Sequence, residues 1–236
     1  MRMTSLLAPA AAAAVVAATL ASSVQAAIAL SAPPGLANGD KFRFLFVTRT
    51  TTFAPSSFPS HYDAFVTDDA DGATYNGVAI NWKAVVSAGS TVTARVNVGG
   101  FGSSAGVYLA DGTKIAHNMG SNSGGLWSGS LLAAPNIQID STALESGIQR
   151  VWTGSNSYGE RRYAAGAWAT LGQTYCGIGD ANRSTSDWLH YSLGSNTDQY
   201  RLYGLSQEFT YVAVPAPSAL ALLGAAGLVG GRRRRG

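Results

Sequence analysis

The sequence predicts a single α+β domain of short antiparallel strands, one main helix and long loops. Apolar and polar residues alternate over many short segments, which is the period of a half-buried strand. Only one segment, beginning at Ser60, has the spacing and start signal of a longer helix. The 28 glycines and the lack of an internal repeat favour one domain with many turns.

The first predicted strand runs from Lys41 to Thr48. Phe42, Phe44 and Phe46 recur at every second position, so one face of this strand is entirely aromatic. The chain then passes through a loop that contains Pro55 and reaches the helix.

The main helix is predicted to begin at Ser60 and to end at Gly72. Ser60 and Asp63 have the spacing of a capping box, with Asp in place of the usual Glu. Glycine ends a helix readily because it adopts positive φ without a steric penalty. Four apolar residues fall near one face of this helix: Tyr62, Phe65, Val66 and Ala70.

The strands that follow are shorter. Residues 78–87 alternate and predict a second strand, whereas residues 91–98 fit either a strand or a short helix. Residues 107–116 predict a hairpin with a type I′ turn at Asp111-Gly112, and residues 120–129 a glycine-rich loop. Further apolar or alternating segments follow at 131–140, 151–154, 168–171, 188–193, 200–205 and 208–214.

The N-terminus has the features of a cleaved export signal. Arg2 supplies the positive charge, an apolar stretch runs from Leu6 to Leu20, and small residues allow cleavage after Ala26 or Ala27. We therefore assign residues 1–26 to a signal peptide, 27–40 to a flexible leader and 41–210 to an extracellular domain.

Residues 211–236 have three parts in a fixed order. Val214-Pro215-Ala216-Pro217 forms a rigid, extended elbow, because proline fixes φ and lacks an N–H. The uncharged run 218–231 spans about 21 Å as a helix, which is short for a hydrocarbon core of about 30 Å. Four arginines follow this run and should stay cytoplasmic, which places everything before Pro215 outside: Arg232, Arg233, Arg234 and Arg235.

This tail resembles a PEP-CTERM sorting signal. The resemblance implies a bacterial protein that the Sec machinery exports and that a membrane protease-transpeptidase, exosortase, then receives. It also implies at least a transient transmembrane helix before release to the cell surface or the medium. Ala216 stands where the family usually has Glu, which leaves the processing site open. The alternative is a plain C-terminal membrane anchor.

The net positive charge of the chain comes from its two terminal segments. Of 16 Lys and Arg residues, five lie in the two terminal segments, and the remaining 11 stand against 13 acidic residues. The exported part is thus slightly acidic, and a nucleic-acid partner is not indicated. The only cysteine, Cys176, cannot form an internal disulfide, so it is either a reactive thiol or a small buried hydrophobe.

Several short motifs lie in order along the middle of the chain: Phe46-Val47-Thr48, Trp82-Lys83-Ala84, Asp111-Gly112-Thr113-Lys114, Leu126-Trp127-Ser128-Gly129, Val151-Trp152-Thr153-Gly154, Trp188 and Arg201-Leu202-Tyr203. With these motifs, the segment from Lys41 to Glu208 resembles bacterial extracellular domains of the C-type-lectin and endostatin-like fold. The resemblance carries over no calcium-dependent sugar site, because Ala134-Pro135-Asn136 lacks the carboxylate or amide of the lectin calcium loop, and paired cysteines are missing.

We find no convincing catalytic, metal or cofactor site in the sequence. Residues 102–106 match the G-x-S-x-G pattern around Ser104, but a hairpin strand follows where a nucleophile elbow needs a helix. Asp68, Asp69 and Asp71 lack the first and twelfth ligands of an EF-hand, so we interpret them as a solvated helix end. The three histidines share no ligand spacing: His61, His117 and His190.

Three aromatic residues in predicted loops are candidate ligand contacts. Trp127, Tyr158 and Tyr163 could stack on sugars, and they could equally belong to the core. We therefore expect an exported cell-surface or biofilm-matrix protein with a structural or adhesive role, and not an enzyme. The alternatives are a carbohydrate-binding module with an extracellular polysaccharide as partner, and a secreted hydrolase.

Overall fold

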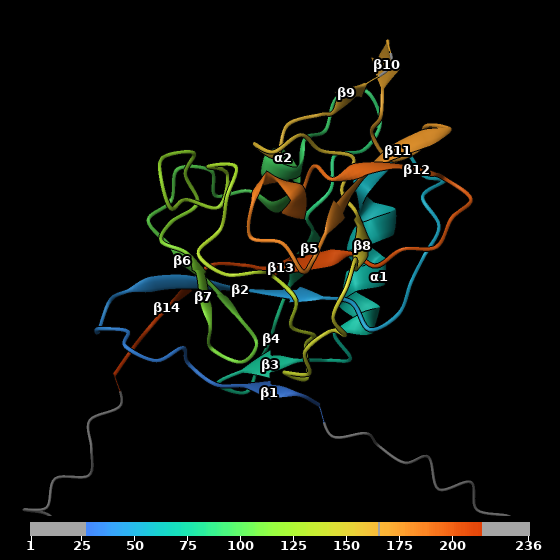
Figure 1. The fold of residues 1–236 in the computed structure, drawn as a ribbon. Helices are drawn as coiled ribbons and strands as arrows, with labels where there is room; N and C mark the ends of the chain where they lie inside the picture. Colours follow the sequence, from blue (N-terminus) through green and yellow to red (C-terminus); the bar gives the residue numbers. More distant parts are fainter. Residues whose placement is uncertain (1–26, 165, 214–236) are drawn as a thin grey trace, which may run out of the picture.

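The computed structural model describes residues 27–164 and 166–213 (Figure 1). The predicted signal peptide and the sorting signal from Val214 onward lie outside these residues. Within the described part, no helix is long and apolar enough to cross a membrane. The described residues form mostly strands and two short α-helices, which agrees with the predicted α+β class.

A six-stranded mixed sheet forms the centre of the molecule (Figure 1). Its central strand β2 runs parallel to β6, whereas the other pairs in this sheet are antiparallel, so the prediction of antiparallel strands throughout was wrong. The strands in spatial order are β5 (Trp82–Ala84), β13 (Tyr203–Ser206), β2 (Lys41–Val47), β6 (Gly106–Leu109) and β7 (Lys114–Ala116), with β14 (Phe209–Thr210) also paired to β2.

Three smaller sheets and three helical segments surround this sheet. They are β1 (Ala29–Leu30), β3 (Thr74–Tyr75) and β4 (Val78–Ala79); β8 (Arg150–Trp152), β11 (Tyr175–Asp180) and β12 (Ser192–Ser195); β9 (Tyr163–Ala164) and β10 (Ala167–Trp168); and the helices α1 (Pro59–Asp69), α2 (Ala94–Val98) and the 3₁₀ turn η1 (Ser186–Trp188).

Strand β2 is buried on both faces. Its three phenylalanines enter one core cluster with residues of α1, as the aromatic alternation predicts. Leu45 and Val47 enter a second cluster on the other face, beside β6 and β7. Arg43 is buried there too, and its guanidinium donates to the carbonyl oxygen of Val98 at 3.0 Å. The sheet therefore separates two cores.

Helix α1 begins one residue earlier than predicted and without the capping box. Pro59 occupies its first turn, where the missing N–H costs nothing, and Phe58 makes no side-chain cap. Asp63 points to the neighbouring strand instead and accepts hydrogen bonds from Lys83 Nζ, Ala84 N and Asn97 Nδ2. A carboxylate thus joins α1 to β5 and α2.

Several predicted strands are shorter than expected or differ in type. The segment 78–87 contains only β4 and β5, because the chain passes from the sheet of β1 and β3 to the six-stranded sheet between them. The segment 91–98 contains α2, capped by Thr93, which confirms the helical alternative. Within 131–140 only isolated bridges form, and 188–193 is divided between η1 and β12.

The predicted hairpin at 107–116 is confirmed as β6 and β7, but its turn differs. Leu109 N donates to Thr113 O, which leaves three residues in the loop, and Gly112 alone has positive φ (87°). A type I′ turn would need Asp111 in the left-handed region as well. The Asp111 carboxylate instead accepts from Thr113 N, which stabilises a longer turn.

The expected leader 27–40 takes part in the fold. β1 pairs in parallel with β3, and Leu30 is buried in the core. The C-terminal end lies beside it, since Gly39 N donates to Tyr211 O and Ala213 N donates to Asn38 Oδ1. The first and last strands therefore lie in the lower half of Figure 1, and the hairpin of β9 and β10 extends from the opposite end.

Candidate functional site

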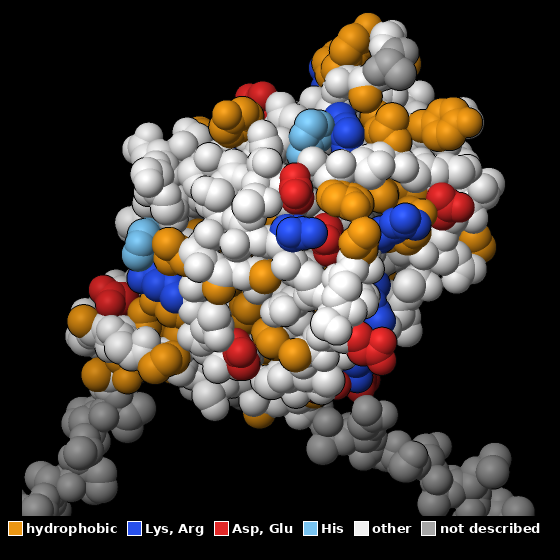
Figure 2. Space-filling view, in the orientation of Figure 1, with side chains coloured by type: hydrophobic (Ala, Val, Ile, Leu, Met, Phe, Trp, Pro, Cys, Tyr) orange, Lys and Arg blue, Asp and Glu red, His pale blue; other side chains and the backbone are white. Residues whose placement is uncertain are grey.

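The hairpin of β9 and β10 carries exposed aromatic rings at the end of the molecule farthest from β1 (Figure 1). Tyr163 and Trp168 are directly paired across the two strands, so their side chains lie on the same face. Their ring centroids are 5.1 Å apart in an edge-to-face arrangement, and the rings are 61% and 43% exposed. Figure 2 shows hydrophobic side chains gathered at this end.

A basic side chain supports the tryptophan from one side. The guanidinium carbon of Arg161 lies 4.1 Å from the centroid of the Trp168 ring, in cation–π geometry. The same guanidinium donates a hydrogen bond to the carbonyl oxygen of Ser90, in another segment of the chain. Arg161 thereby fixes the tryptophan to the body of the domain.

The hairpin borders a cavity of about 340 Å³ whose lining continues onto β11. Tyr175, the first residue of β11, is 63% exposed because its neighbour Cys176 points inward and side chains alternate along a strand. Trp168 and Tyr175 both line this cavity, together with Gln173 and Thr174. Within the described residues, neither of these two polar side chains makes a hydrogen bond to the chain.

Of the three candidate ligand contacts, Trp127 lies in the core, which confirms the alternative stated for it and removes it from the candidates. Its side chain is fully buried and stacks on Trp188 at 6.4 Å between ring centroids. Gly159 covers it so closely that an added Cβ would overlap the indole ring. Trp127 therefore has no surface to offer a ligand.

Tyr158 and Tyr163 are both exposed, but their neighbours differ. Tyr163 contacts Trp168, whereas Tyr158 is 51% exposed and lies beside Gly129, and neither lines the cavity of Trp168 and Tyr175. Trp168 and Tyr175 were missed at the sequence level. The signal that could have found them is Gly166 between two short aromatic segments, which marks a hairpin tip.

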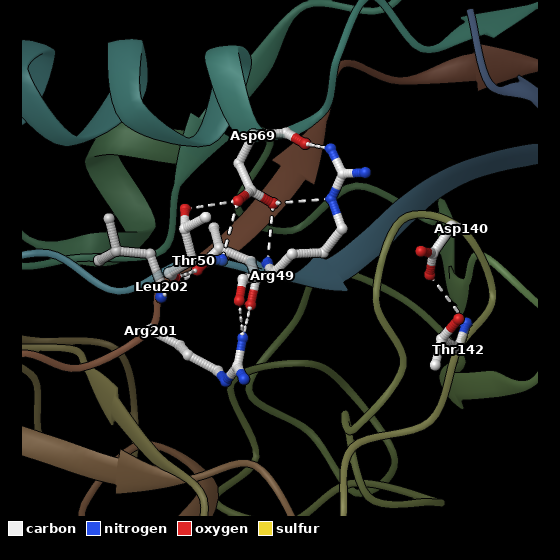
Figure 3. A network of polar contacts seen from close by, with 8 residues as sticks. Arg49, Thr50, Asp69, Asp140, Thr142, Arg201 and Leu202 are labelled. Atoms are coloured by element: carbon white, nitrogen blue, oxygen red, sulfur yellow. Dashed lines mark hydrogen bonds and ion pairs between the residues drawn. The ribbon is translucent and has the colours of Figure 1, made fainter. Parts of the chain in front are cut away.

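Asp69, one member of the acidic cluster at the end of α1, is not solvated, which corrects the interpretation for this residue, whereas Asp68 is exposed as expected (Figure 3). Asp69 is 7% exposed, and its carboxylate accepts hydrogen bonds from Arg49 N at 2.8 Å, Thr50 N at 3.0 Å and Thr50 Oγ1 at 2.7 Å. Arg201 donates from the other side to the carbonyl oxygens of Thr48 and Arg49. These bonds tie the loop after β2 to the helix.

The other sites considered in the sequence do not assemble into a catalytic group. Ser104 and His117 line one cavity of about 390 Å³, yet no hydrogen bond joins them in the described chain, and β6 rather than a helix follows the serine. His61 and His190 are both exposed. In the described ranges, no group of three or more His, Cys, Asp or Glu side chains could hold a metal ion.

Cys176 is fully buried, which confirms the prediction that it is a small buried hydrophobe. Its Sγ lies 3.2 Å from the carbonyl oxygen of Gln173. Burial raises the pKa of the thiol to about 11, so the group is protonated near neutral pH. Thiol chemistry needs the thiolate, and the sulfur is both neutral and covered.

We expect Cys176 to resist alkylation in the folded protein. Iodoacetamide at neutral pH should leave the intact mass unchanged, whereas the same reagent in guanidinium chloride should add one label, because unfolding exposes the thiol and restores its ordinary pKa. Mass spectrometry of both samples measures this. Complete labelling of the folded protein within the time that free cysteine takes would contradict the burial.

Comparisons with known proteins do not assign the chain to a protein family. No protein-family model matches it. No curated protein matches it either.

Proposed function

We propose that this chain is an exported bacterial protein that a C-terminal sorting signal delivers to the cell surface or the extracellular matrix, where its domain has a structural or adhesive role. The observation that carries this proposal is the order of the tail: the Pro215-Ala216-Pro217 elbow, the uncharged run 218–231 and four arginines. The N-terminal signal-like segment 1–26 supports it independently.

The arrangement of the domain supports display away from a membrane. The last described residues leave the fold beside Asn38 and Gly39, so the chain enters and leaves at one end. The aromatic hairpin is at the other end (Figure 1). A membrane that holds the tail would thus leave the hairpin directed outward.

We also propose that the domain has a C-type-lectin-like fold. The support is the order of the motifs between Lys41 and Glu208, together with a main helix packed on a mixed sheet and long loops between short strands. An experimental structure superposed on lectin-like and on unrelated domains of equal size tests this. A better match to an unrelated topology would contradict it.

The sorting proposal is tested by the C-terminus of the protein recovered from its native cells. We expect intact mass and peptide mapping to show a chain that ends near Pro217 and lacks Arg232 to Arg235. Replacing the four arginines by glutamine should block processing, because the positive charges hold the tail in the cytoplasm. Ala216→Glu, which restores the usual residue of the motif, should raise the processed fraction.

The opposite result is a chain that keeps its arginines and stays with the inner membrane. It would make the tail a simple anchor and contradict sorting. Processing that proceeds unchanged without the arginines would contradict the assigned role of the charge.

A further inference from the structure

The exposed aromatic group at the hairpin, formed by Tyr163, Trp168 and Tyr175, is a feature that the fold does not require. Each ring is between 43% and 63% exposed, and Trp168 joins the other two because it contacts Tyr163 and shares a cavity with Tyr175. Large aromatic side chains gathered on a surface mark an interaction site more often than isolated ones do. We name this group the hairpin platform.

The platform is held in place before any ligand binds. Arg161 packs against Trp168 and is itself hydrogen-bonded to Ser90 O. The base of the hairpin is fixed to the domain, since Ala169 N donates to Arg162 O at 3.0 Å and Gly177 N donates to Ala169 O at 2.7 Å. Rings that are already ordered lose little conformational entropy when a ligand stacks on them.

The lining of the cavity restricts the chemistry of the ligand. Besides the two rings it contains alanines, Leu193 and the side chains of Gln173 and Thr174, and no acidic or basic residue. An uncharged ligand suits such a lining, because a charged one would be desolvated without a partner. The amide and hydroxyl groups can both donate and accept hydrogen bonds, which hydroxyl groups of a ligand would satisfy.

The geometry points to an uncharged polysaccharide, built of hexoses with equatorial hydroxyl groups, as the ligand of the hairpin platform. A hexose ring with equatorial hydroxyl groups has flat apolar faces of C–H bonds, which the negative face of an aromatic ring attracts. Its rim carries the hydroxyl groups that Gln173 and Thr174 can bind. The cavity of about 340 Å³ lies within the range of about 300–1,000 Å³ of small-ligand sites.

This inference deepens the proposed adhesive role and rests on it for its biological setting. At the end of the domain opposite β1 and β14, the platform would meet matrix polysaccharide outside the cell (Figure 1). The binding itself is a property of the domain. Display and binding can therefore be measured separately.

The test uses the full-length gene and its variants expressed in the native cells, with the protein recovered in mild detergent. Retention is measured on insoluble cellulose and chitin, and by affinity electrophoresis in hydroxyethyl cellulose. We expect Trp168→Ala to weaken binding about tenfold or more, and Trp168→Phe, which keeps a ring, to retain most of it. Binding should survive EDTA and added salt, because no ion pair is involved.

Tyr158→Ala is the matched control, because Tyr158 is exposed to a similar degree and lies outside the cavity. It should bind as the unchanged protein does. Melting temperatures show which variants are folded, and Tyr175→Ala provides the same readout if Trp168→Ala does not fold.

Four results of the binding measurements would overturn the inference. They are no retention on any of these polysaccharides, equal retention of Trp168→Ala, an equal loss in Tyr158→Ala, and salt-sensitive binding to an acidic polysaccharide such as alginate in place of the neutral ones. Self-association that Trp168→Ala abolishes, without polysaccharide binding, would make the platform a contact between copies and would also overturn it.

Surface display is scored in the same cells by protease accessibility. Display without binding contradicts the platform as a polysaccharide site and leaves the proposed function intact. Binding by a protein that never reaches the surface contradicts the proposed function and supports the site.

Discussion

Trp127→Ala should lower the free energy of unfolding by about 3–5 kcal/mol, the usual cost of removing a fully buried large aromatic side chain. The indole ring stacks on Trp188 and lies under Gly159, so its loss leaves a cavity that neither neighbour can fill without moving the backbone. Urea unfolding followed by circular dichroism measures the change.

Trp168→Ala is the control for this result. The same substitution at a half-exposed tryptophan should change the free energy of unfolding by about 1 kcal/mol or less, because no closed cavity forms. A Trp127→Ala protein that is as stable as the unchanged chain would contradict the burial of this residue.

Asp69→Ala should also be strongly destabilising, by about 3–5 kcal/mol. The substitution removes the acceptor of two backbone N–H groups, Arg49 N and Thr50 N, and of the ion pair with the Arg49 guanidinium (Figure 3). The carboxylate is buried and the two bonds are partly buried, and a donor that loses its acceptor away from water costs about 1–3 kcal/mol. Asp69→Asn keeps one acceptor oxygen, so we expect an intermediate loss.

The neighbouring Asp68→Ala serves as the matched control in the same unfolding experiment. Asp68 is exposed, and its removal should change the free energy of unfolding by no more than about 0.5 kcal/mol. Equal effects of the two alanine substitutions would show that general charge at the end of α1, and not the bonded network, stabilises this region.

The sequence predicts parts of the fold that depend on local pattern. The aromatic alternation of Phe42, Phe44 and Phe46 places them correctly in one core, and the position of α1 follows from its apolar spacing. The burial of Arg43 could not be foreseen, because its acceptors Val98 O and Ser206 O come from distant segments.

The make-up of the candidate site depends even more than the fold on contacts between residues that are far apart in the sequence. Trp127 and Trp168 both lie near glycines, in segments for which the sequence predicts loops or short strands. Trp127 is nevertheless fully buried, whereas Trp168 is half-exposed. The difference is set by Gly159, which covers Trp127, and by the hairpin, which carries Trp168 away from the body of the domain. Neither can be derived from residues adjacent in sequence.

The pairing of β2 has a consequence for the order of events during synthesis. This strand is made early, but two of its partners, β13 and β14, are among the last parts of the domain to be made. Contacts of such long sequence separation form slowly. The central sheet therefore cannot be completed until nearly all of the described domain has been made, and a truncation before Tyr203 would leave one edge of β2 unpaired and open to aggregation.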